Sequence, residues 1–488
     1  MENPNNNLPS LRELHGTRLY GYSMGYFGIM LMMMLTGSYS YTFYVYTIRL
    51  DSILVSIGST IYMVTMAFSS IIFGVILDNT KPKKIGKRRP YILIGLPLWL
   101  IPTILIYLPP WIPPETLAIS STVLYWPLAI WYWALNIIRA IFGGLLIMVF
   151  SSILPEISQT LENRKKVATL SANLTILSSI ISISFPNIIQ SLIDDPRNTG
   201  YWTSSGKFIM DVMPIVSITF AIPTTICILI AFFSIDESFH LKDSDFQKRR
   251  IRDTFKNLFI PVKDKEYMKF MAGGVSTQMS QYVLAFTVIP FIAFVLGRTL
   301  SPKQISGLYI LYIIISITTK FIWLLIWKII MDKQRNLLKT YKLNLIFMIF
   351  AAFLELFFLF ELNAPLGLIL FILSFGTVMG SMYATPLFNS PLLNEMVDRA
   401  AEMHLVNNTR ESLNKGQAVT RLSGAYYGLM MFTASMVGAI TSVIFGIVFQ
   451  GENSQNPIIL TIGLMSMGLF QIVSLVFLRF FKVRFKES

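Results

Sequence analysis

Long apolar stretches alternate with short polar segments along most of the chain. A bilayer core requires roughly 20 apolar residues per helix, and windows of that length recur throughout the sequence. Their expected bounds are 20–46, 52–77, 90–108, 120–150, 168–193, 209–234, 267–296, 304–331, 338–361, 365–390, 417–449 and 457–481. The pattern therefore predicts an all-α membrane protein with twelve transmembrane helices.

One long polar segment divides these spans into two groups of six. Residues 235–266 form this linker, which separates a first half at 20–234 from a second half at 267–482. Short segments, 1–19 and 483–488, flank the halves. Two six-helix halves in one chain are typical of carriers built from parallel repeats.

Positive charge is distributed unevenly among the loops. The linker is basic, and the loop after the second span carries Lys81, Lys83, Lys84, Lys87, Arg88 and Arg89. Basic loops remain in the cytoplasm, so we expect both termini of a multi-pass cell-membrane protein to be cytoplasmic. The N-terminal segment shows no pattern of a cleaved signal peptide.

Composition excludes several classes of protein. The chain is 54% hydrophobic and only 14% charged, far from the balance of a soluble domain. The net charge is +14, but the charged residues lie in the segments between apolar spans, which argues against nucleic-acid binding. The single cysteine, Cys227, allows no intrachain disulfide. With only three histidines and no nucleotide-binding loop, we expect neither an enzyme nor a pump, and no metal or cofactor.

The loop after the second span carries a specific motif. It reads Gly74-Val75-Ile76-Leu77-Asp78, followed by Gly86-Lys87-Arg88-Arg89-Pro90. This resembles the loop signature of the major facilitator superfamily, and its long form is similar to the glycoside–pentoside–hexuronide cation symporters and, less closely, to the sucrose transporters. Leu154 to Ser158 and Arg421 to Gly428 match the same branch. The resemblance implies a carrier of sugar-like solutes that works by alternating access.

The sodium site of that branch is not implied for this chain. Sodium-coupled members hold their cation with acids on spans two and four, where this sequence has Met66 to Ser70 and Leu146 to Phe150. A hard cation needs oxygen ligands. We therefore expect any ion coupling to use H⁺, with Lys320 or Glu355 as the titratable group. Uncoupled facilitated diffusion is the alternative.

Span four contains a cation far from either membrane face, Arg139. Such a residue costs at least roughly 2.5 kcal/mol unless it is paired or hydrated. Tyr132, Asn136, Arg139 and Gly143 share one helical face. The resemblance implies that spans four and eight border a central cavity from opposite halves, and we expect Asn136 and Arg139 to bind substrate there, with Lys320 lining the same cavity. In the alternative, Arg139 is structural and bonds to carbonyls of neighbouring helices.

Span eight contains the second deep cation, Lys320, on a face shared with Ser316, Trp323 and Trp327. A cation beside indole rings suits both the apolar face and the hydroxyl or carboxylate edge of a sugar. We expect Lys320 and Trp323 to contact substrate. In the alternative, Lys320 extends along the helix toward the interface.

Two further spans offer polar contacts. Gln278 and Gln281 share a face of span seven with Gly274, and their amides suit hydroxyl groups, although they could instead join helices. Tyr26 in span one could stack on a sugar or serve only in packing. The resemblance implies that span nine is peripheral, so we expect Glu355 in that span to bond locally at a helix interface.

The charged residues of the signature loop lie at the expected cytoplasmic mouth. Asp78, Lys87, Arg88 and Arg89 are predicted to act as a gate rather than to bind substrate, because ion pairs there can hold one conformer closed.

These features predict a monomeric carrier of a small solute in the lipid bilayer. We favour a sugar, glycoside or hexuronide, since two deep cations without nearby acids favour an anionic ligand. A carrier for another organic anion or a drug-like compound is the alternative of the same architecture. A membrane receptor or enzyme is the alternative of a different class.

Overall fold

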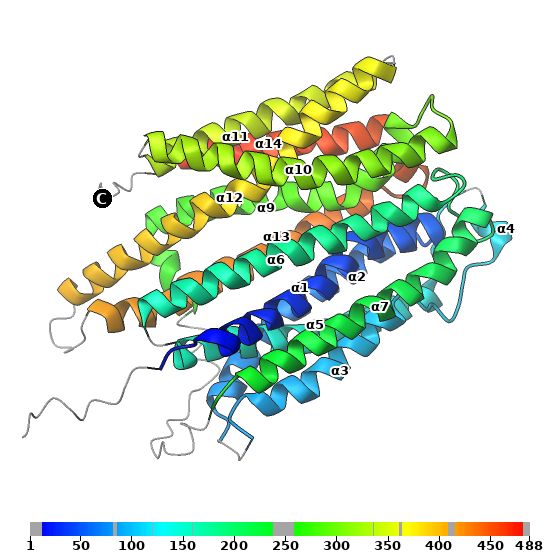
Figure 1. Cartoon of the computed structure of the whole chain (residues 1–488). Helices are drawn as coiled ribbons and strands as arrows, with labels where there is room; N and C mark the ends of the chain where they lie inside the picture. The colour runs from blue at the N-terminus through cyan, green and yellow to red at the C-terminus, as the bar shows by residue number, and fades with distance from the viewer. Residues whose placement is uncertain are drawn as a thin grey trace, which may run out of the picture.

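The computed structural model describes residues 12–81, 85–119, 121–158, 160–237, 258–334, 336–360, 364–407 and 415–481. These residues are mostly helical, with an isolated parallel β-bridge between Leu50 and Val123. The long helices lie side by side along one direction (Figure 1).

Each half contributes six long helices. The first half consists of α1 (Gly16–Thr42), α2 (Ser52–Asp78), α3 (Arg89–Leu105), α5 (Trp126–Ile157), α6 (Leu161–Leu192) and α7 (Ser204–Ser234). The second half consists of α9 (Lys265–Phe291), α10 (Pro302–Gln334), α11 (Leu337–Leu354), α12 (Ala364–Asn407), α13 (Lys415–Val448) and α14 (Pro457–Arg479). Shorter turns are η1 (Phe43–Thr47), α4 (Glu115–Ala118), η3 (Ile260–Lys263), η4 (Ile292–Leu296), η5 (Glu355–Leu359) and η6 (Gly451–Gln455).

All twelve predicted spans correspond to helices. Eleven are long and apolar enough to cross a bilayer, and α3 is a shorter apolar helix. The main correction concerns α12, which we expected to end near residue 390 but which continues to Asn407. Hydropathy detects only the part of a helix that lies in lipid, whereas polar helix formers extend α12 beyond it.

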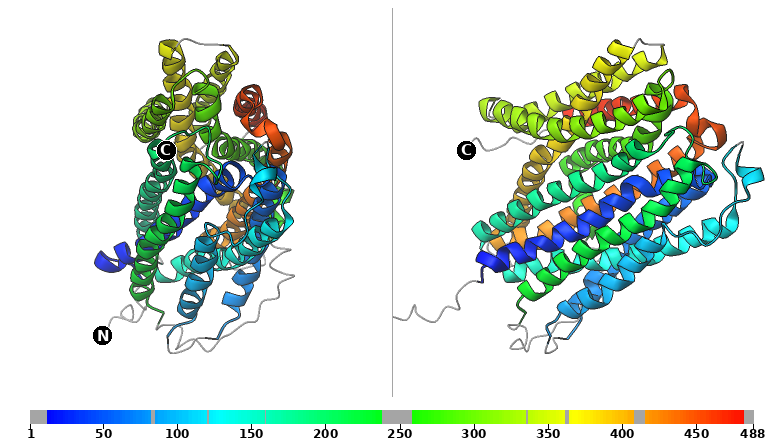
Figure 2. Two further views of the ribbon diagram at one scale, coloured as in Figure 1. Left: turned by 90° about the vertical axis from the view of Figure 1, so that its right-hand side faces the viewer. Right: turned by 45° about the vertical axis from the view of Figure 1, so that its right-hand side comes forward.

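The first helix of the chain begins, and the last helix ends, on the same side of the molecule. We call the side where α1 begins and α14 ends the terminal face, and the side that holds α4 the opposite face (Figures 1 and 2). The basic loop between α2 and α3 lies on the terminal face.

A few helices connect the halves. Helix α2 packs on α13, α6 on α10, and α1 on α9. Within each half the main pairs include α2 with α5, α1 with α7, α10 with α12 and α9 with α14. Among the described residues, the extensive contacts of α3, α7, α11 and α14 all stay within one half, so these helices are peripheral.

The apolar core is divided unevenly between the faces. One cluster of buried residues runs through the first half and continues into the opposite-face part of the second half, for example through Val283, Ile305 and Phe445. A separate cluster, from Leu258 to Phe481, belongs to the terminal-face part of the second half. The halves therefore share their main buried core toward the opposite face, while Ile71 of α2 packs against the edge of the second cluster.

Candidate solute site and gates

Arg139 lies in the middle of α5, between that helix and α2. Its guanidinium carbon is 4.1 Å from the centroid of the Tyr62 ring, and Nη2 donates a 2.8 Å hydrogen bond to Oδ1 of Asn136. Asn136 donates in turn to the carbonyl of Tyr132. Arg139 is 6% exposed, and its Nε has no hydrogen-bond partner among the described residues. The arginine is therefore held by a ring and an amide, without a carboxylate.

Lys320 is the buried cation of the second half and lies on α10. Its Nζ lies 3.9 Å from the centroid of the Tyr383 ring on α12 and has no hydrogen-bond partner among the described residues. The residue is 1% exposed. Because Lys320 does not reach the surface, the alternative that it extends to the interface is wrong.

The two cations have reciprocal surroundings. In a parallel repeat α2 corresponds to α10, and α5 corresponds to α12. In the first half the cation is on α5 and its tyrosine on α2, whereas in the second half the cation is on α10 and its tyrosine on α12. Arg139 lies about 20 Å along α5 and Lys320 about 27 Å along α10, counted from the opposite face. Each side chain contacts a ring of its own half, and the described contacts do not join them.

Gln278 lies on the face of α9 that we expected to be polar. It lines a small pocket with Gly274, Asn389 and Thr433, at the junction of α9, α12 and α13. A side chain at Gly274 would meet nothing within 4 Å. Gln281 is half-buried on the same face. Gly274 therefore faces open space, and Gln278 lies beside it at a junction of three helices.

Tyr26 and Trp323 are both packed against neighbouring rings. Tyr26 is half-buried, and its ring centroid lies 5.9 Å from that of Tyr22 and 5.8 Å from that of Phe150. Trp323 stacks on Trp327 at 5.8 Å, and its indole fills the space beside Gly380 of α12. In this conformation packing accounts for most of the surface of both rings.

Glu355 begins η5 at the end of α11 and is fully buried, and neither carboxylate oxygen has a hydrogen-bond partner among the described residues. Its turn packs on the peripheral helix α14.

The signature loop is fastened to the first half by Glu237, a residue that the sequence analysis did not single out. The Glu237 carboxylate accepts hydrogen bonds from the backbone N–H groups of Arg88, at 3.0 and 2.9 Å, and Arg89, at 3.0 Å. Gly86 has φ +121°, and a Cβ there would lie 2.3 Å from Oε2 of Glu237. The motif therefore needs glycine at this position for two reasons, conformation and space.

The loop's arginine side chains reinforce that attachment. Arg88 Nη1 donates to the carbonyl of Ser152 on α5 at 2.7 Å, and the Arg89 guanidinium carbon lies 4.3 Å from the Phe232 ring centroid on α7. Lys87 is half-buried. The fourth expected gate residue, Asp78, has a side chain outside the described residues.

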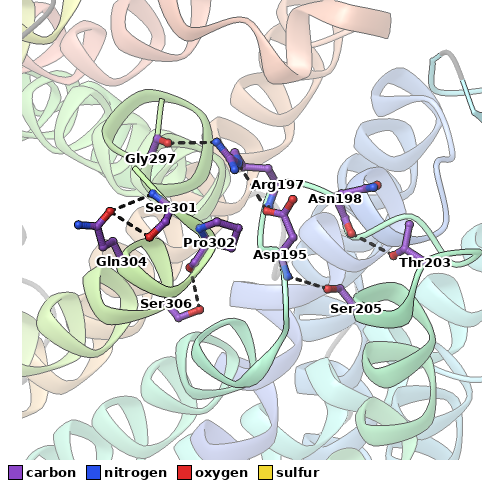
Figure 3. Close-up of polar contacts among 10 residues, drawn as sticks. All are labelled: Asp195, Arg197, Asn198, Thr203, Ser205, Gly297, Ser301, Pro302, Gln304 and Ser306. Atoms are coloured by element: carbon purple, nitrogen blue, oxygen red, sulfur yellow. Dashed lines mark hydrogen bonds and ion pairs between the residues drawn. The ribbon is translucent and has the colours of Figure 1, made fainter. Parts of the chain in front are cut away.

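The opposite face is closed by hydrogen bonds between the halves. Tyr46 donates to the carbonyl of Ser454 at 2.7 Å and Ser52 to that of Gly446 at 2.7 Å. Figure 3 shows a third contact, in which Nη1 of Arg197 donates to the carbonyl of Gly297 at 3.5 Å while Asp195 pairs with the same arginine.

Two π-helical turns add rings to this closure. Both α1 and α9, the first helices of the two halves, end in five-residue π turns, η1 and η4. The Tyr46 and Phe294 rings of these turns stack at 6.0 Å. The same irregularity at matching places supports a repeated architecture.

Residues 21–402, most of the chain, match the family model described as MFS/sugar transport protein. The chain belongs to this family of the major facilitator superfamily (MFS). It is therefore a small-molecule transporter of the membrane and not an enzyme.

Solved structures agree on the fold of this transporter. The nucleoside transporter NupG is 12% identical and has a TM-score of 0.58, with 96% of this chain and 100% of that chain covered; a mutant of NupG gives a TM-score of 0.62 at the same identity and coverage. A bacterial homologue of the human drug peptide transporters PepT1 and PepT2 is 11% identical, with a TM-score of 0.56 and coverage of 95% and 97%. No curated protein is matched.

Sequence reasoning missed several residues of the transporter's polar network. Tyr62 and Tyr383 carried no signal, because a tyrosine in a span is equally suited to packing. Glu237 was visible only as one acid in a charged linker. Its role depends on a chain reversal that brings residues 86–89 to the end of α7.

Proposed function

We propose that this MFS transporter carries an acidic sugar, such as a hexuronide, between the two faces of the cell membrane by alternating access. The observation that carries the proposal is the pair of buried cations, Arg139 and Lys320, neither of which has an acidic partner among the described residues. A carboxylate supplied by the solute would neutralise them and offset their desolvation.

Aromatic and amide groups near the cations suit the rest of a sugar. The Tyr62 and Tyr383 rings offer apolar faces to a pyranose ring. Gln278 and Gln281 of α9 offer donors and acceptors to hydroxyl groups, and Gln278 lines a small pocket beside the open space at Gly274. We infer that solute binds at this level between the halves and draws the cations away from their tyrosines.

The shared core supports an alternating-access cycle. In this conformation the halves share a buried core toward the opposite face, and most of the terminal-face cluster belongs to the second half. With both termini cytoplasmic, as the basic loops favour, this would be an inward-facing state of a monomeric carrier. Rocking of the halves would open the contacts of Tyr46, Ser52 and Arg197 and expose the site to the other side.

Coupling to H⁺ rather than Na⁺ is also part of the proposal. The stretches Met66 to Ser70 and Leu146 to Phe150 supply no carboxylate for a cation. Lys320 and Glu355, both buried within helices of the second half, are the groups that we assign to the proton. Facilitated diffusion without coupling is the alternative.

Transport by reconstituted protein tests cargo and coupling together. We expect proteoliposomes to take up labelled glucuronate or a glucuronide in preference to the neutral parent sugar, and accumulation to respond to an imposed pH gradient at matched voltage. Accumulation driven by a Na⁺ gradient alone would refute H⁺ coupling. Preference for the neutral sugar would refute an acidic cargo, while uptake of unrelated organic anions at equal rates would favour a general anion carrier.

A further inference from the structure

A polar pocket of about 330 Å³ lies between the halves at the opposite face. The first half lines it with Arg49, Ser121 and Thr122, and the second half with Glu452, Gln455 and Asn456. Its size is that of pockets which hold small molecules. The pocket is distant in sequence from the buried cations, and nothing in the transport cycle proposed above uses it.

Arg49 is fixed at this pocket by its backbone. Its φ of +66° is the only positive value at a non-glycine residue in the described part of the chain. Its carbonyl accepts a 2.8 Å hydrogen bond from the N–H of Val123. Such a conformation costs of order 1 kcal/mol or more and persists only where surrounding structure enforces it.

The Arg49 side chain is nearly buried without a counter-ion. It is 9% exposed, its Nε has no hydrogen-bond partner, and it forms no ion pair within the described residues. Its guanidinium carbon lies 5.7 Å from the centroid of the Trp202 ring. Burial lowers the pKa of Arg49, which reflects the desolvation that an anion would offset.

The second half offers donors to the same space. Asn456 caps α14, and its Oδ1 accepts from the N–H groups of Ile458 and Ile459 at 2.9 and 3.4 Å. Its side-chain NH₂ group takes no part in this cap, and the residue lines the pocket. The start of α14 also carries the positive end of a helix dipole.

We propose that this pocket binds a small anion bearing a carboxylate or phosphate group, which joins Arg49 to Asn456 and so holds the halves together at the opposite face. The guanidinium provides a fork that matches both groups, and the amide completes the contact from the other half. The binding partner is separate from the transported solute, so the inference stands whatever the cargo is.

Glu452 allows an anion site to be distinguished from a latch, by which we mean a direct ion pair between Arg49 and Glu452 that joins the halves. It is exposed at the pocket and forms no ion pair with Arg49 in the structure. For an anion site, Glu452→Gln should tighten binding because a like charge is removed, whereas Arg49→Gln should abolish it. For an Arg49–Glu452 latch, both changes would weaken closure of the opposite face in the same direction.

Thiol labelling can measure occupancy directly. The only cysteine of the chain, Cys227, is buried, so a Ser121→Cys variant in nanodiscs places one reactive thiol at the half-buried lining of the pocket. We expect inorganic phosphate or sodium glucuronate at about ten times its Kd to slow maleimide labelling about tenfold. Glucose is the neutral control.

Further variants test whether the slower labelling by maleimide, here called protection, depends on Arg49. Protection should disappear with Arg49→Gln, persist in part with Arg49→Lys, and strengthen with Glu452→Gln. Adding Arg139→Gln to the Ser121→Cys variant should leave this protection unchanged. Variants are compared only if their labelling rate without anion matches that of Ser121→Cys alone, which confirms that the pocket is intact.

The same experiment contains the results that would overturn the site. Protection by neither phosphate nor glucuronate, equal protection by glucose, or protection that survives Arg49→Gln would each do so. Protection that vanishes with Arg139→Gln would assign the effect to the cargo site. Protection by phosphate alone or by glucuronate alone would support the site and identify which chemistry it prefers.

Discussion

Buried cations usually have carboxylate partners, but Arg139 and Lys320 are each placed over a tyrosine ring. A cation–π contact contributes about 0.5–2 kcal/mol, which is less than the cost of burying an unpaired charge in a membrane. Each cation therefore reduces the stability of the empty protein. Under the proposed function, a solute carboxylate offsets this cost, because neither cation has an acidic partner among the described residues.

Neutralising Lys320 should change the stability of the protein and its affinity for an acidic solute in opposite directions. We expect Lys320→Met to raise the thermal midpoint of the empty protein, because a desolvated charge is removed, and to weaken glucuronate binding about tenfold, or about 1.4 kcal/mol. Binding of the neutral sugar should change little. Lys328→Gln, an exposed position on the same helix, is the control. A fall in stability with equal loss of both ligands would indicate a packing role.

The α2–α3 loop is an element whose conformation depends on one distant carboxylate. Glu237 receives N–H groups at the start of α3, where a helix dipole favours negative charge. Gly86 allows the close approach. The basic motif is thus a structural attachment to α5 and α7 as well as a candidate gate.

Replacing the carboxylate should loosen this loop. Glu237→Gln leaves one acceptor oxygen where two now accept, and charge-assisted hydrogen bonds contribute roughly 1.5–3 kcal/mol. We expect a lower midpoint of thermal unfolding and faster hydrogen exchange at residues 86–89. Glu162→Gln, in an exposed pair with Lys166, should have little effect. Unchanged exchange in Glu237→Gln would show that the attachment is not needed.

Asp78 addresses the gating role of the same loop. Asp78→Ala should slow transport far more than it weakens equilibrium binding of solute, because the residue is predicted to affect exchange between conformers rather than to contact the ligand. Parallel measurements of uptake rate and binding affinity decide the matter. Equal losses in both would support a binding or folding role instead.

At the scale of the whole molecule, the halves meet most closely where α2 packs on α13. A Cβ at Gly446 would lie 2.4 Å from Cβ of Ser56, and Ser52 bonds to the Gly446 carbonyl. This contact, with Tyr46 and Arg197, keeps the opposite face closed. Small residues here allow the two helices to approach and separate during transport.

A larger side chain at Gly446 should prevent that closure. We expect Gly446→Val to stop net transport and to increase maleimide labelling of a cysteine at Ser121. Gly424→Val on the same helix, where an added Cβ meets nothing within 4 Å, is the matched control and should transport normally. Normal labelling and uptake in Gly446→Val would mean that the closed opposite face is not part of the cycle.

The sequence alone determined the membrane class, the twelve spans and the division into halves, because lipid imposes a length and an apolar composition on every spanning helix. It also located Arg139 and Lys320, since a charge inside an apolar window is visible without a structure. The signature loop was recognisable for the same reason, as a short motif with fixed spacing.

Only the tertiary structure decided what these residues contact. Tyr62 and Tyr383 are distant in sequence from the cations they cover, and Glu237 lies 149 residues from Arg88. The Arg49 pocket is formed by two halves that come together at residues near 49, 121 and 455. Hydropathy and helical periodicity describe one helix at a time, whereas such contacts arise from packing between helices, which neither pattern encodes.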